Sequence, residues 1–510
     1  MKRRNFIGKA IAATVIPTLV NGFSLKGFAA NTMLHRVLAS APPMNDHVLV
    51  MVRLTGGNDG LNTVVPIDVY PNYYNARTNI AIPQNRILPL TGINTLGLHP
   101  SLSGMQTMYN EGNLGIIQSV GYPNPSFSHF RATDIWMSGS NSNEILTSGW
   151  GGRYLEYEFD AFPNGYPNSG MPDPLAIQIG SSASLALQGS SVNMGMSISD
   201  PTNFYNFLNG VEDPLPADNA GKELSYIRSV VKQTQLYSTV IKNAALSVTQ
   251  QVAYPADNSV AAQLKIVARL IKGGLKTRVY LVEHKGFDTH SLQTDSADTT
   301  VGRHADLLTE LSQAVKAFQD DLSFLQIEDR VVGMTFSEFG RRIKSNSSGG
   351  TDHGAAAPMF VFGKKVNTTV LGTTPVLPAT ATVDDNIAMQ HDFRSVYASL
   401  LEQWLCVRPT DMDEILLQNF TSLPLIESAS CNTTTYVFNG DGYWSDASNW
   451  VGNIIPPLNV TGNAEIIIDP QVGGKCILNL NISQRVGPGA RIIVKPSKVF
   501  VTEGDLIQAQ

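Results

Sequence analysis

Five short apolar segments constrain the fold of this chain more than any other feature of its sequence. They are HVLVMVRL (47–54), LGIIQSV (114–120), RVYLVEH (278–284), RVVGMTF (330–336) and MFVFG (359–363). They lack the alternation of apolar and polar residues that a half-exposed sheet shows, which is typical of strands buried on both faces of a parallel sheet. We therefore expect five buried parallel strands.

Helical patterns lie between these segments. Apolar residues recur three and four positions apart over 307–325, which predicts one apolar face of a long helix. Similar faces are predicted over 224–241 and 262–270, and residues 392–405 form a further helix with Asp392 as a candidate N-cap. Strands that alternate with helices predict a doubly wound α/β domain with a mostly parallel sheet.

Changes in composition divide the chain into segments. Residues 140–215 are rich in Gly, Ser, Asn and Pro, which predicts a long insertion or lid in a domain that spans 45–425. Over 433–510, turn residues separate short β-like runs, which predicts a small all-β module of solenoid or sandwich type. Trp444 and Trp450 at its start either stack on a sugar or cover the first strands, and the covering role is favoured.

The first thirty residues have the composition of an export signal. They combine a basic start, a modest apolar stretch and a small-residue exit, and Arg3-Arg4 followed by Phe6-Ile7 resembles a bacterial twin-arginine signal. The apolar stretch is too short and too interrupted for a stable membrane span, and no other segment looks transmembrane. We expect residues 1–30 to be a twin-arginine signal peptide and the mature protein to be periplasmic, secreted or at the cell surface.

Net charge and cysteine count exclude several classes of function. The 510 residues carry a net charge of −6, with Lys and Arg scattered, so the chain has no basic stripe for nucleic acid. Three cysteines are too few for a disulfide framework or a cysteine-rich zinc site. In an oxidising compartment, Cys431 and Cys476 could pair.

Polar side chains lie at the ends of the predicted strands. In an open parallel sheet, ligand sites lie beyond the carboxyl ends of the strands, so we expect these side chains to share one site. They are Asn58 and Asp59 after 47–54, Ser126, Ser128 and His129 after 114–120, Asp288 and His290 after 278–284, Glu338 and Arg341 after 330–336, and Asp352 and His353 ahead of 359–363. Carboxylates with imidazoles suit zinc, manganese or iron, and one or two such ions would clamp an ester oxygen and lower the pKa of a bound water or hydroxyl.

Several candidates also have a structural interpretation. Ser128 is a serine nucleophile, the N-cap of the following helix, or both. Glu338 is either a metal ligand or the partner of Arg341 or Arg342 in a salt bridge. His304, on the polar side of the long helix, is either a further ligand or a solvated histidine, and the solvated role is favoured.

The pair Asp352–His353 lies in GGTDHGAAAP, where little side chain surrounds it. Adjacent residues of a strand point to opposite faces, so both side chains serve one site only if they lie in a loop. We expect His353 to bind metal. Asp352 either shares the ion or orients the imidazole of His353 from outside.

In combination, these motifs are similar to those of an exported bacterial family. A twin-arginine signal followed by LTGGNDGLNTVVP, LHPSL, SFSHFRATDIW, GFDTH, SEFGRR and GTDHG resembles the domain of unknown function fifteen-oh-one, regarded as a distant branch of the alkaline phosphatase and sulfatase superfamily. The resemblance covers roughly residues 1–425. It implies an α/β fold of alkaline-phosphatase type, a two-metal site and hydrolysis of phosphate or sulfate esters.

Carried over by order along the chain, the resemblance implies roles for the candidate residues. The implied metal ligands are Asp59, Asp288, His290, Glu338 and His353. Ser128, in preference to Ser126, is the implied nucleophile, and Arg341 is a candidate for binding the anion. Three departures from the superfamily pattern stand out. His290 follows Asp288 by only two residues, a closer spacing than the superfamily usually has, and no histidine follows Glu338. No Cys- or Ser-x-Pro-x-Arg stretch is present, which argues against a formylglycine sulfatase.

Together these features predict an exported, metal-dependent hydrolase that acts on a small or glycan-linked phosphate or sulfate ester. The alternative is a non-catalytic envelope or binding protein that keeps the same fold, with or without one metal ion. In that case the predicted insertion and the β module would contact glycans or an envelope partner.

Overall fold

The computed structural model describes residues 17–20, 23–26, 45–159, 162–168, 170–180, 184–199, 237–427, 431, 434–460, 464–487, 490–495 and 497–508. The chain divides into two units, one made of residues 46–157 and 161–430 and the other of residues 1–45, 158–160 and 431–510. The twin-arginine motif lies outside the described residues. Within the predicted signal peptide, the structure describes β1 (Pro17–Val20) and β2 (Phe23–Lys26), which pair as a hairpin.

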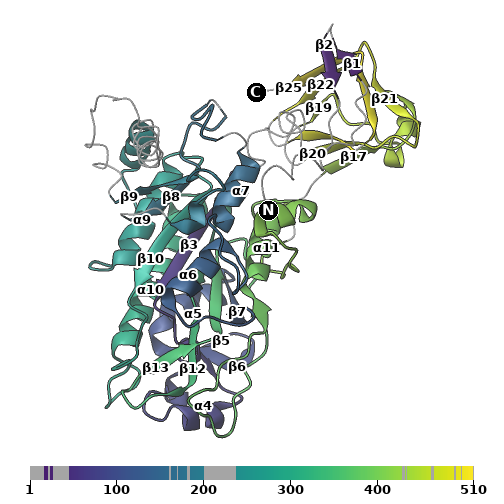
Figure 1. Ribbon diagram of the computed structural model, residues 1–510. Helices are drawn as coiled ribbons and strands as arrows, with labels where there is room; N and C mark the ends of the chain where they lie inside the picture. The colour runs from purple at the N-terminus through teal and green to yellow at the C-terminus, as the bar shows by residue number, and fades with distance from the viewer. Residues whose placement is uncertain are drawn as a thin grey trace, which may run out of the picture. The chain divides into compact units, whose positions relative to one another are not determined.

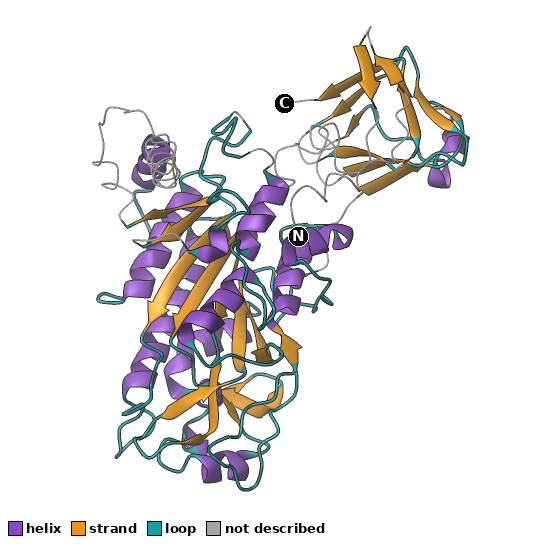
Figure 2. Cartoon of the chain, in the orientation of Figure 1, coloured by secondary structure: helices purple, strands orange, loops and turns teal. Residues whose placement is uncertain are grey.

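The larger unit is built on a nine-stranded sheet with helices on both faces (Figures 1 and 2). Across the sheet the strands are β15 (Val370–Leu371), β7 (Leu114–Gly121), β14 (Ala357–Phe362), β11 (Val331–Phe336), β3 (Val48–Thr55), β10 (Val279–Lys285), β8 (Ala176–Ile179) and β9 (Gly195–Ile198), with β16 (His391–Asp392) beside β7. All five apolar segments are strands of this sheet. The predicted α/β class is therefore confirmed.

One of the five predicted strands runs against the others. β14 pairs antiparallel with both β7 and β11, whereas β3 pairs parallel with β10 and β11. The prediction of a parallel strand at 359–363 is therefore wrong. Because β14 is reversed, its amino end lies at the edge where β7, β11, β3 and β10 have their carboxyl ends. Residues that precede β14 consequently share that edge.

One face of the sheet is covered by the helices that the apolar periodicity predicts. α9 (Ser259–Lys272) and α10 (Arg303–Phe324) pack against each other, and α10 also packs on α5 (Ser103–Asn110). Their buried side chains form one core with alternate residues of β3. Most of the helix predicted over 224–241 lies outside the described residues. In the described part of the chain, no helix is both long enough and apolar enough to cross a bilayer.

The other face carries α6 (His129–Ser138), α7 (Trp150–Glu158) and α11 (Phe393–Gln403), which stacked aromatic rings join to one another. A further stacked pair joins α6 to β11. Asp392 is the N-cap of α11, as predicted: its side chain accepts a hydrogen bond from the backbone N–H of Arg394 at 2.9 Å.

Part of the predicted insertion belongs to the sheet itself. β8 and β9 lie within 140–215 and extend the sheet beyond β10 by parallel pairing. Gly and Ser residues around them made this segment resemble a loop, although the strands AIQI and GMSI are themselves mostly apolar. The prediction of an insertion or lid is therefore wrong for these residues.

The smaller unit contains a three-sided parallel β-solenoid, one of the two predicted architectures. Each turn of the chain contributes one strand to each of three parallel sheets. The first sheet consists of β17 (Thr434–Phe438), β20 (Ala464–Ile468) and β23 (Arg491–Val494), the second of β18 (Gly442–Tyr443), β21 (Lys475–Leu478) and β24 (Val499–Thr502), and the third of β19 (Asn459–Val460), β22 (Ser483–Val486) and β25 (Asp505–Gln508).

Trp444 and Trp450 belong to the solenoid core. Both are buried, their rings meet edge to face at 4.8 Å, and Trp450 Nε1 donates a hydrogen bond to the Trp444 carbonyl. Buried rings cannot stack on a sugar, so the covering role holds. Cys476 is a free thiol buried in the same core, so the predicted pairing of Cys431 with Cys476 is wrong.

Candidate metal centre

The candidate site lies at the sheet edge where the loops after β7, β10 and β11 meet the residues before β14. Five side chains that contact one another come from these segments. They are His129 at the start of α6, Asp288 and His290 after β10, Glu338 after β11, and His353 in β13 (Thr351–Gly354). The reversed direction of β14 thus brings His353 to the edge that the other four occupy.

Three histidines converge on the carboxylate of Asp288. Its Oδ1 atom lies 3.1 Å from Nε2 of His290 and 3.3 Å from Nε2 of His353. Its Oδ2 atom lies 3.4 Å from Nε2 of His129. The Nε2 atoms of His290 and His353 are 2.9 Å apart. The four side chains are between 21% and 45% exposed, so small molecules can reach the cluster from solvent.

The opposite nitrogen of each imidazole faces a hydrogen-bond acceptor. The pairs are His129 Nδ1 with Glu338 Oε1 at 3.1 Å, His290 Nδ1 with Asp352 Oδ1 at 3.1 Å, and His353 Nδ1 with the Phe127 carbonyl at 2.8 Å. Carbonyl and ionised carboxylate oxygens accept hydrogen bonds and cannot donate them, so each ring in its neutral form carries its proton on Nδ1. All three Nε2 lone pairs therefore face Asp288.

Such a group of acceptors can hold a cation. With the protons on Nδ1, no hydrogen lies between Nε2 of His290, Nε2 of His353 and Oδ1 of Asp288, although these atoms are only 2.9 to 3.3 Å apart. Zinc binds nitrogen and oxygen at about 2.0–2.2 Å, which places neighbouring ligands about 3–3.5 Å apart. His129, Asp288 and His353 offer ligand atoms that all lie within 4.8 Å of one another, so these three side chains fit one divalent cation.

Electrostatics favour the protonation states that a metal ion needs. Burial lowers the pKa of His353, and the charge of Arg341 lowers it further, against the opposing effect of the hydrogen bond to the Phe127 carbonyl. Burial alone would raise the pKa of Asp288, but the hydrogen bond and the charge of Arg341 bring it below its ordinary value. Neutral imidazole and ionised carboxylate are the forms that bind metal.

Glu338, one of the predicted ligands, reaches the cluster through His129. Its side chain is 1% exposed, and Oε1 accepts hydrogen bonds from His129 Nδ1 and from the backbone N–H of Gly56, at 3.1 and 2.8 Å. Within the described residues, neither Arg341 nor Arg342 forms an ion pair with it. The salt-bridge alternative is therefore wrong, and Glu338 orients an imidazole instead.

Arg341 holds Asp288 in place. Its side chain is fully buried, and Nη2 lies 2.6 Å from Asp288 Oδ1. The guanidinium also donates to the carbonyls of Gly57 and Thr351, at 2.7 and 2.8 Å, and to those of Gly56 and Phe287. Because no part of this side chain is exposed, the geometry does not support the predicted role of Arg341 in binding an anion.

Asp59 is separate from the cluster. Its carboxylate is fully buried and lies 2.9 and 2.8 Å from Arg77 Nη1 through its two oxygens, while Gln293 donates to Oδ2 at 2.6 Å. Burial alone would raise the pKa of Asp59, but the charge of Arg77 brings it below its ordinary value. A buried arginine thus already neutralises this predicted ligand.

Ser128, the predicted nucleophile, lies between two residues that contact the cluster. The Phe127 carbonyl bonds His353, and the His129 ring faces Asp288. Ser128 occupies the N-cap position of α6, yet its exposed hydroxyl makes no capping hydrogen bond. By contrast, Oγ of Ser126 accepts a hydrogen bond from the Ser128 N–H at 3.4 Å. The Ser128 hydroxyl is thus the more open of the two.

Asp352 and His353 lie in a strand and not, as predicted, in a loop. β13 pairs with β12 (Gly340–Ser345) as a short hairpin with irregular register. The two side chains still serve one site because His290 contacts both, Asp352 through Nδ1 at 3.1 Å and His353 through Nε2 at 2.9 Å. Asp352 therefore orients His290, and the expectation that it orients His353 is wrong.

His129 is the cluster member that the predicted ligand set lacks. It follows Ser128 directly, and the chain has only nine histidines. The sequence places this histidine at a strand end next to the candidate nucleophile, and that position is the signal from which its role as a ligand could have been inferred. His304 is neither solvated nor part of the cluster: it is 1% exposed, and its Nε2 lies 3.0 Å from Asn58 Oδ1.

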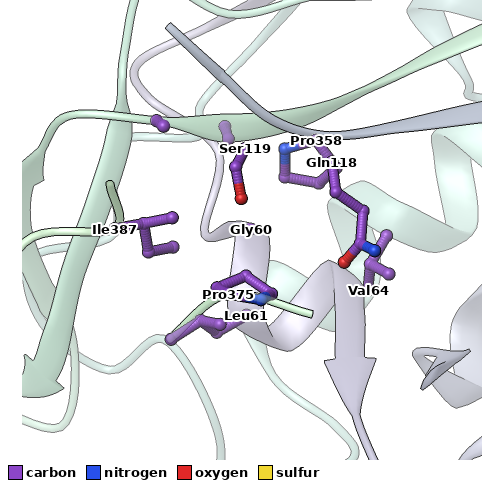
Figure 3. A pocket seen from close by; sticks show the side chains of 10 residues that line it. Gly60, Leu61, Val64, Gln118, Ser119, Pro358, Pro375 and Ile387 are labelled. Carbon is purple, nitrogen blue, oxygen red and sulfur yellow. The ribbon is translucent and has the colours of Figure 1, made fainter. Parts of the chain in front are cut away.

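A small pocket opens near the same edge, between α3 (Gly60–Thr63) and the facing ends of β7 and β14 (Figure 3). Gln118 and Ser119 project into it from β7. Ser119 has a φ of 52° at a bulge, where the register of β7 against β14 shifts. None of the lining residues is charged, so the pocket adds no metal ligand.

Comparisons with known proteins give distant structural likenesses. The crystal structure of Ps i-CgsB in complex with k-i-k-neocarrahexaose is 11% identical, with 75% of each chain covered and a TM-score of 0.32. The PsFucS1 sulfatase from Pseudoalteromonas sp. is 12% identical, with 79% of this chain and 76% of that chain covered and a TM-score of 0.32. Alkaline phosphatase from the Antarctic bacterium TAB5 is 11% identical, with 65% and 95% covered and a TM-score of 0.26.

Sequence comparison places the chain in a family. No curated protein matches it. A family model matches residues 46–401, a range that contains Ser128 and every residue of the cluster. The chain belongs to the family described as "Protein of unknown function (DUF1501)".

Proposed function

We propose that this protein is a metal-dependent hydrolase of phosphate or sulfate esters. The observation that carries the proposal is the convergence of three imidazole Nε2 atoms on one carboxylate, close to an exposed serine hydroxyl. One ion of zinc, manganese or iron would be held by His129, His290, His353 and Asp288. When bound, such an ion supplies Lewis acidity, which polarises an ester oxygen and lowers the pKa of a hydroxyl.

The chain's own residues would have distinct tasks in this reaction. The Ser128 oxygen attacks the phosphorus or sulfur atom, the bond to the ester oxygen breaks, and the serine proton passes to solvent while the departing alcohol takes one up. Water then hydrolyses the serine ester. Glu338 and Asp352 keep the Nε2 lone pairs of His129 and His290 aimed inward, and Arg341 holds Asp288.

We also propose that the protein is exported by the twin-arginine route and acts in the periplasm, in the medium or at the cell surface. The N-terminal composition and the Arg3-Arg4 motif support this proposal. The substrate would be a small or glycan-linked ester, and the solenoid would be available for contact with an envelope partner.

Hydrolysis of p-nitrophenyl phosphate and p-nitrophenyl sulfate tests the proposed activity. The wild-type protein, loaded in turn with zinc, manganese or iron, should hydrolyse at least one of them. Ser128→Ala should lose about 10³-fold or more of kcat while keeping its metal. Undiminished hydrolysis by Ser128→Ala would refute the role of this serine. No turnover of any ester by the metal-loaded protein would favour the alternative, a binding protein that keeps the metal site.

A further inference from the structure

Arg342 is a fixed cation that contacts Phe127, the residue before the candidate nucleophile. It follows the buried Arg341 in β12, and because side chains alternate along a strand it lies on the other face. Its Nε atom donates to the His353 carbonyl at 3.0 Å, and Nη1 donates to the carbonyl of Asp384. The guanidinium lies over the ring of Phe127, 5.1 Å from its centre. Two carbonyls and an aromatic ring therefore hold this side chain in place.

The charge of Arg342 is not balanced by a carboxylate. Within the described part of the chain, no Asp or Glu oxygen lies at ion-pair distance from its guanidinium, and Nη2 has no protein partner. Hydrogen bonds from Thr382 lower the pKa of the Asp385 carboxyl, and the charge of Arg342 lowers it by a smaller amount. The Asp385 carboxylate is bound by the N–H and hydroxyl of Thr382, at 2.6 and 2.9 Å.

Phe127 connects Arg342 to the proposed reaction centre. Its ring contacts the guanidinium, its carbonyl bonds Nδ1 of His353, and the next residue is Ser128. The unbalanced cation therefore contacts the residue that directly precedes the candidate nucleophile.

We infer that Arg342 binds the anionic phosphate or sulfate group of the substrate and presents it to Ser128. This inference rests on the proposed function and names the residue that would select for an oxyanion. A planar guanidinium matches the oxygens of phosphate and sulfate through paired N–H groups, and an arginine already fixed by other contacts loses little freedom on binding.

Binding of inorganic phosphate and inorganic sulfate, measured by titration calorimetry, tests the inference. Arg342→Gln should weaken binding of at least one of these anions by about 10- to 100-fold, because hydrogen bonds to charged groups are among the strong ones. Arg342→Lys keeps the charge but loses the planar fork and should show a smaller loss. Lys344→Gln is the matched control: it removes the same charge two residues along β12, at an exposed position, and should leave binding unchanged.

Two outcomes would overturn the inference: equal anion binding by wild type and Arg342→Gln, or no binding of either anion to the wild type. If Arg342→Gln fails to fold, Phe127→Leu removes the ring under the guanidinium and should also weaken binding, and unchanged binding there would overturn the inference. Metal content, measured on the same samples, tests the proposed function separately. A metal-free protein whose anion binding still depends on Arg342 would refute the metal mechanism and support the anion site.

Discussion

Asp288 and Asp59 follow neighbouring strands of one sheet, yet they lie in opposite kinds of environment. Asp288, after β10, is 45% exposed and faces the Nε2 atoms of three imidazoles. Asp59, after β3, is fully buried and bound by Arg77 and Gln293. The end of a strand brings a carboxylate to the edge of the sheet, but its partners decide whether it can bind a ligand.

Arg77 and Arg341, both buried, contact the two carboxylates in different ways. Arg77 contacts both oxygens of Asp59, whereas the ion-pair contact of Arg341 is to Oδ1 of Asp288. Oδ2 of Asp288 therefore remains open toward His129. One arginine completes a structural ion pair, and the other positions a carboxylate that still has a free oxygen.

Breaking the structural pair should have the largest effect on stability. Arg77→Met leaves the Asp59 carboxylate buried without a counter-charge, which should cost about 3–5 kcal/mol of unfolding free energy, measured by denaturant titration. Asp46→Asn, which breaks the exposed Arg330–Asp46 pair, is the control and should cost less than about 1 kcal/mol. Equal costs in the two variants would mean that the Asp59–Arg77 pair does not stabilise the fold in this way.

Removing a hydrogen-bond partner of a cluster imidazole should lower the affinity for metal and leave the protein folded. Glu338→Gln removes the charge that faces His129 Nδ1, and loss of such a partner typically weakens metal binding by about 10- to 100-fold. Competition with a chromogenic chelator measures this change. Glu310→Gln alters a carboxylate 3.7 Å from His284, away from the cluster, and should leave the affinity as it is. An unchanged affinity in Glu338→Gln would contradict the orienting role.

Acid should destabilise the buried network around Asp59. Burial lowers the pKa of His304 to about 4 and, together with the charge of His304, that of His99 to about 3. Below about pH 6.5, these histidines therefore bind protons in the unfolded chain but not in the folded chain. Their contribution to the unfolding free energy is fully present above pH 6.5 and is lost as the pH falls toward 4. Each histidine should remove about 2 kcal/mol between pH 6 and 4.5.

Unfolding of the chelator-treated protein at a series of pH values measures this loss. His304→Gln should reduce the loss of unfolding free energy between pH 6 and 4.5 by about the contribution of one histidine. An equally steep dependence in that variant would show that His304 is not responsible.

Removal of the candidate nucleophile should have the smallest effect on stability. Because the Ser128 hydroxyl makes no capping bond, Ser128→Ala should change the unfolding free energy by less than about 0.5 kcal/mol. Asn258→Ala removes a side chain that caps α9 by accepting from Ala261 N at 3.0 Å, and it should cost about 1 kcal/mol. A larger loss in Ser128→Ala than in Asn258→Ala would indicate a structural role for this serine.

The positions of the strands were predictable from the sequence, but not all of their directions. Buried strands need continuous apolar runs, and these runs stand out between the helices. An apolar run has the same appearance in either direction, so the reversal of β14 was not visible. It follows from pairing with β7 and β11, which involves residues more than 200 and about 30 positions away.

The location of the site at one edge of the sheet was predictable from the sequence, but only some of its residues were. Asp288, His290 and His353 do meet at one edge, because strand ends converge there. The role of Asp59 depends on Arg77, which directly follows α4 (Tyr70–Ala76), and no local pattern in the sequence indicates that pairing. Whether Arg341 or Arg342 is available to an anion depends on which face of β12 each residue occupies, and the sequence alone does not show this.

Metal content of the purified protein, determined by elemental analysis, tests the central claim most directly. The wild-type protein should carry about one equivalent of zinc, manganese or iron. His353→Ala should lose most of it, and His304→Gln, which alters a buried histidine outside the cluster, should keep it. A wild-type protein without metal, or a His353→Ala variant that retains the wild-type amount, would contradict the account.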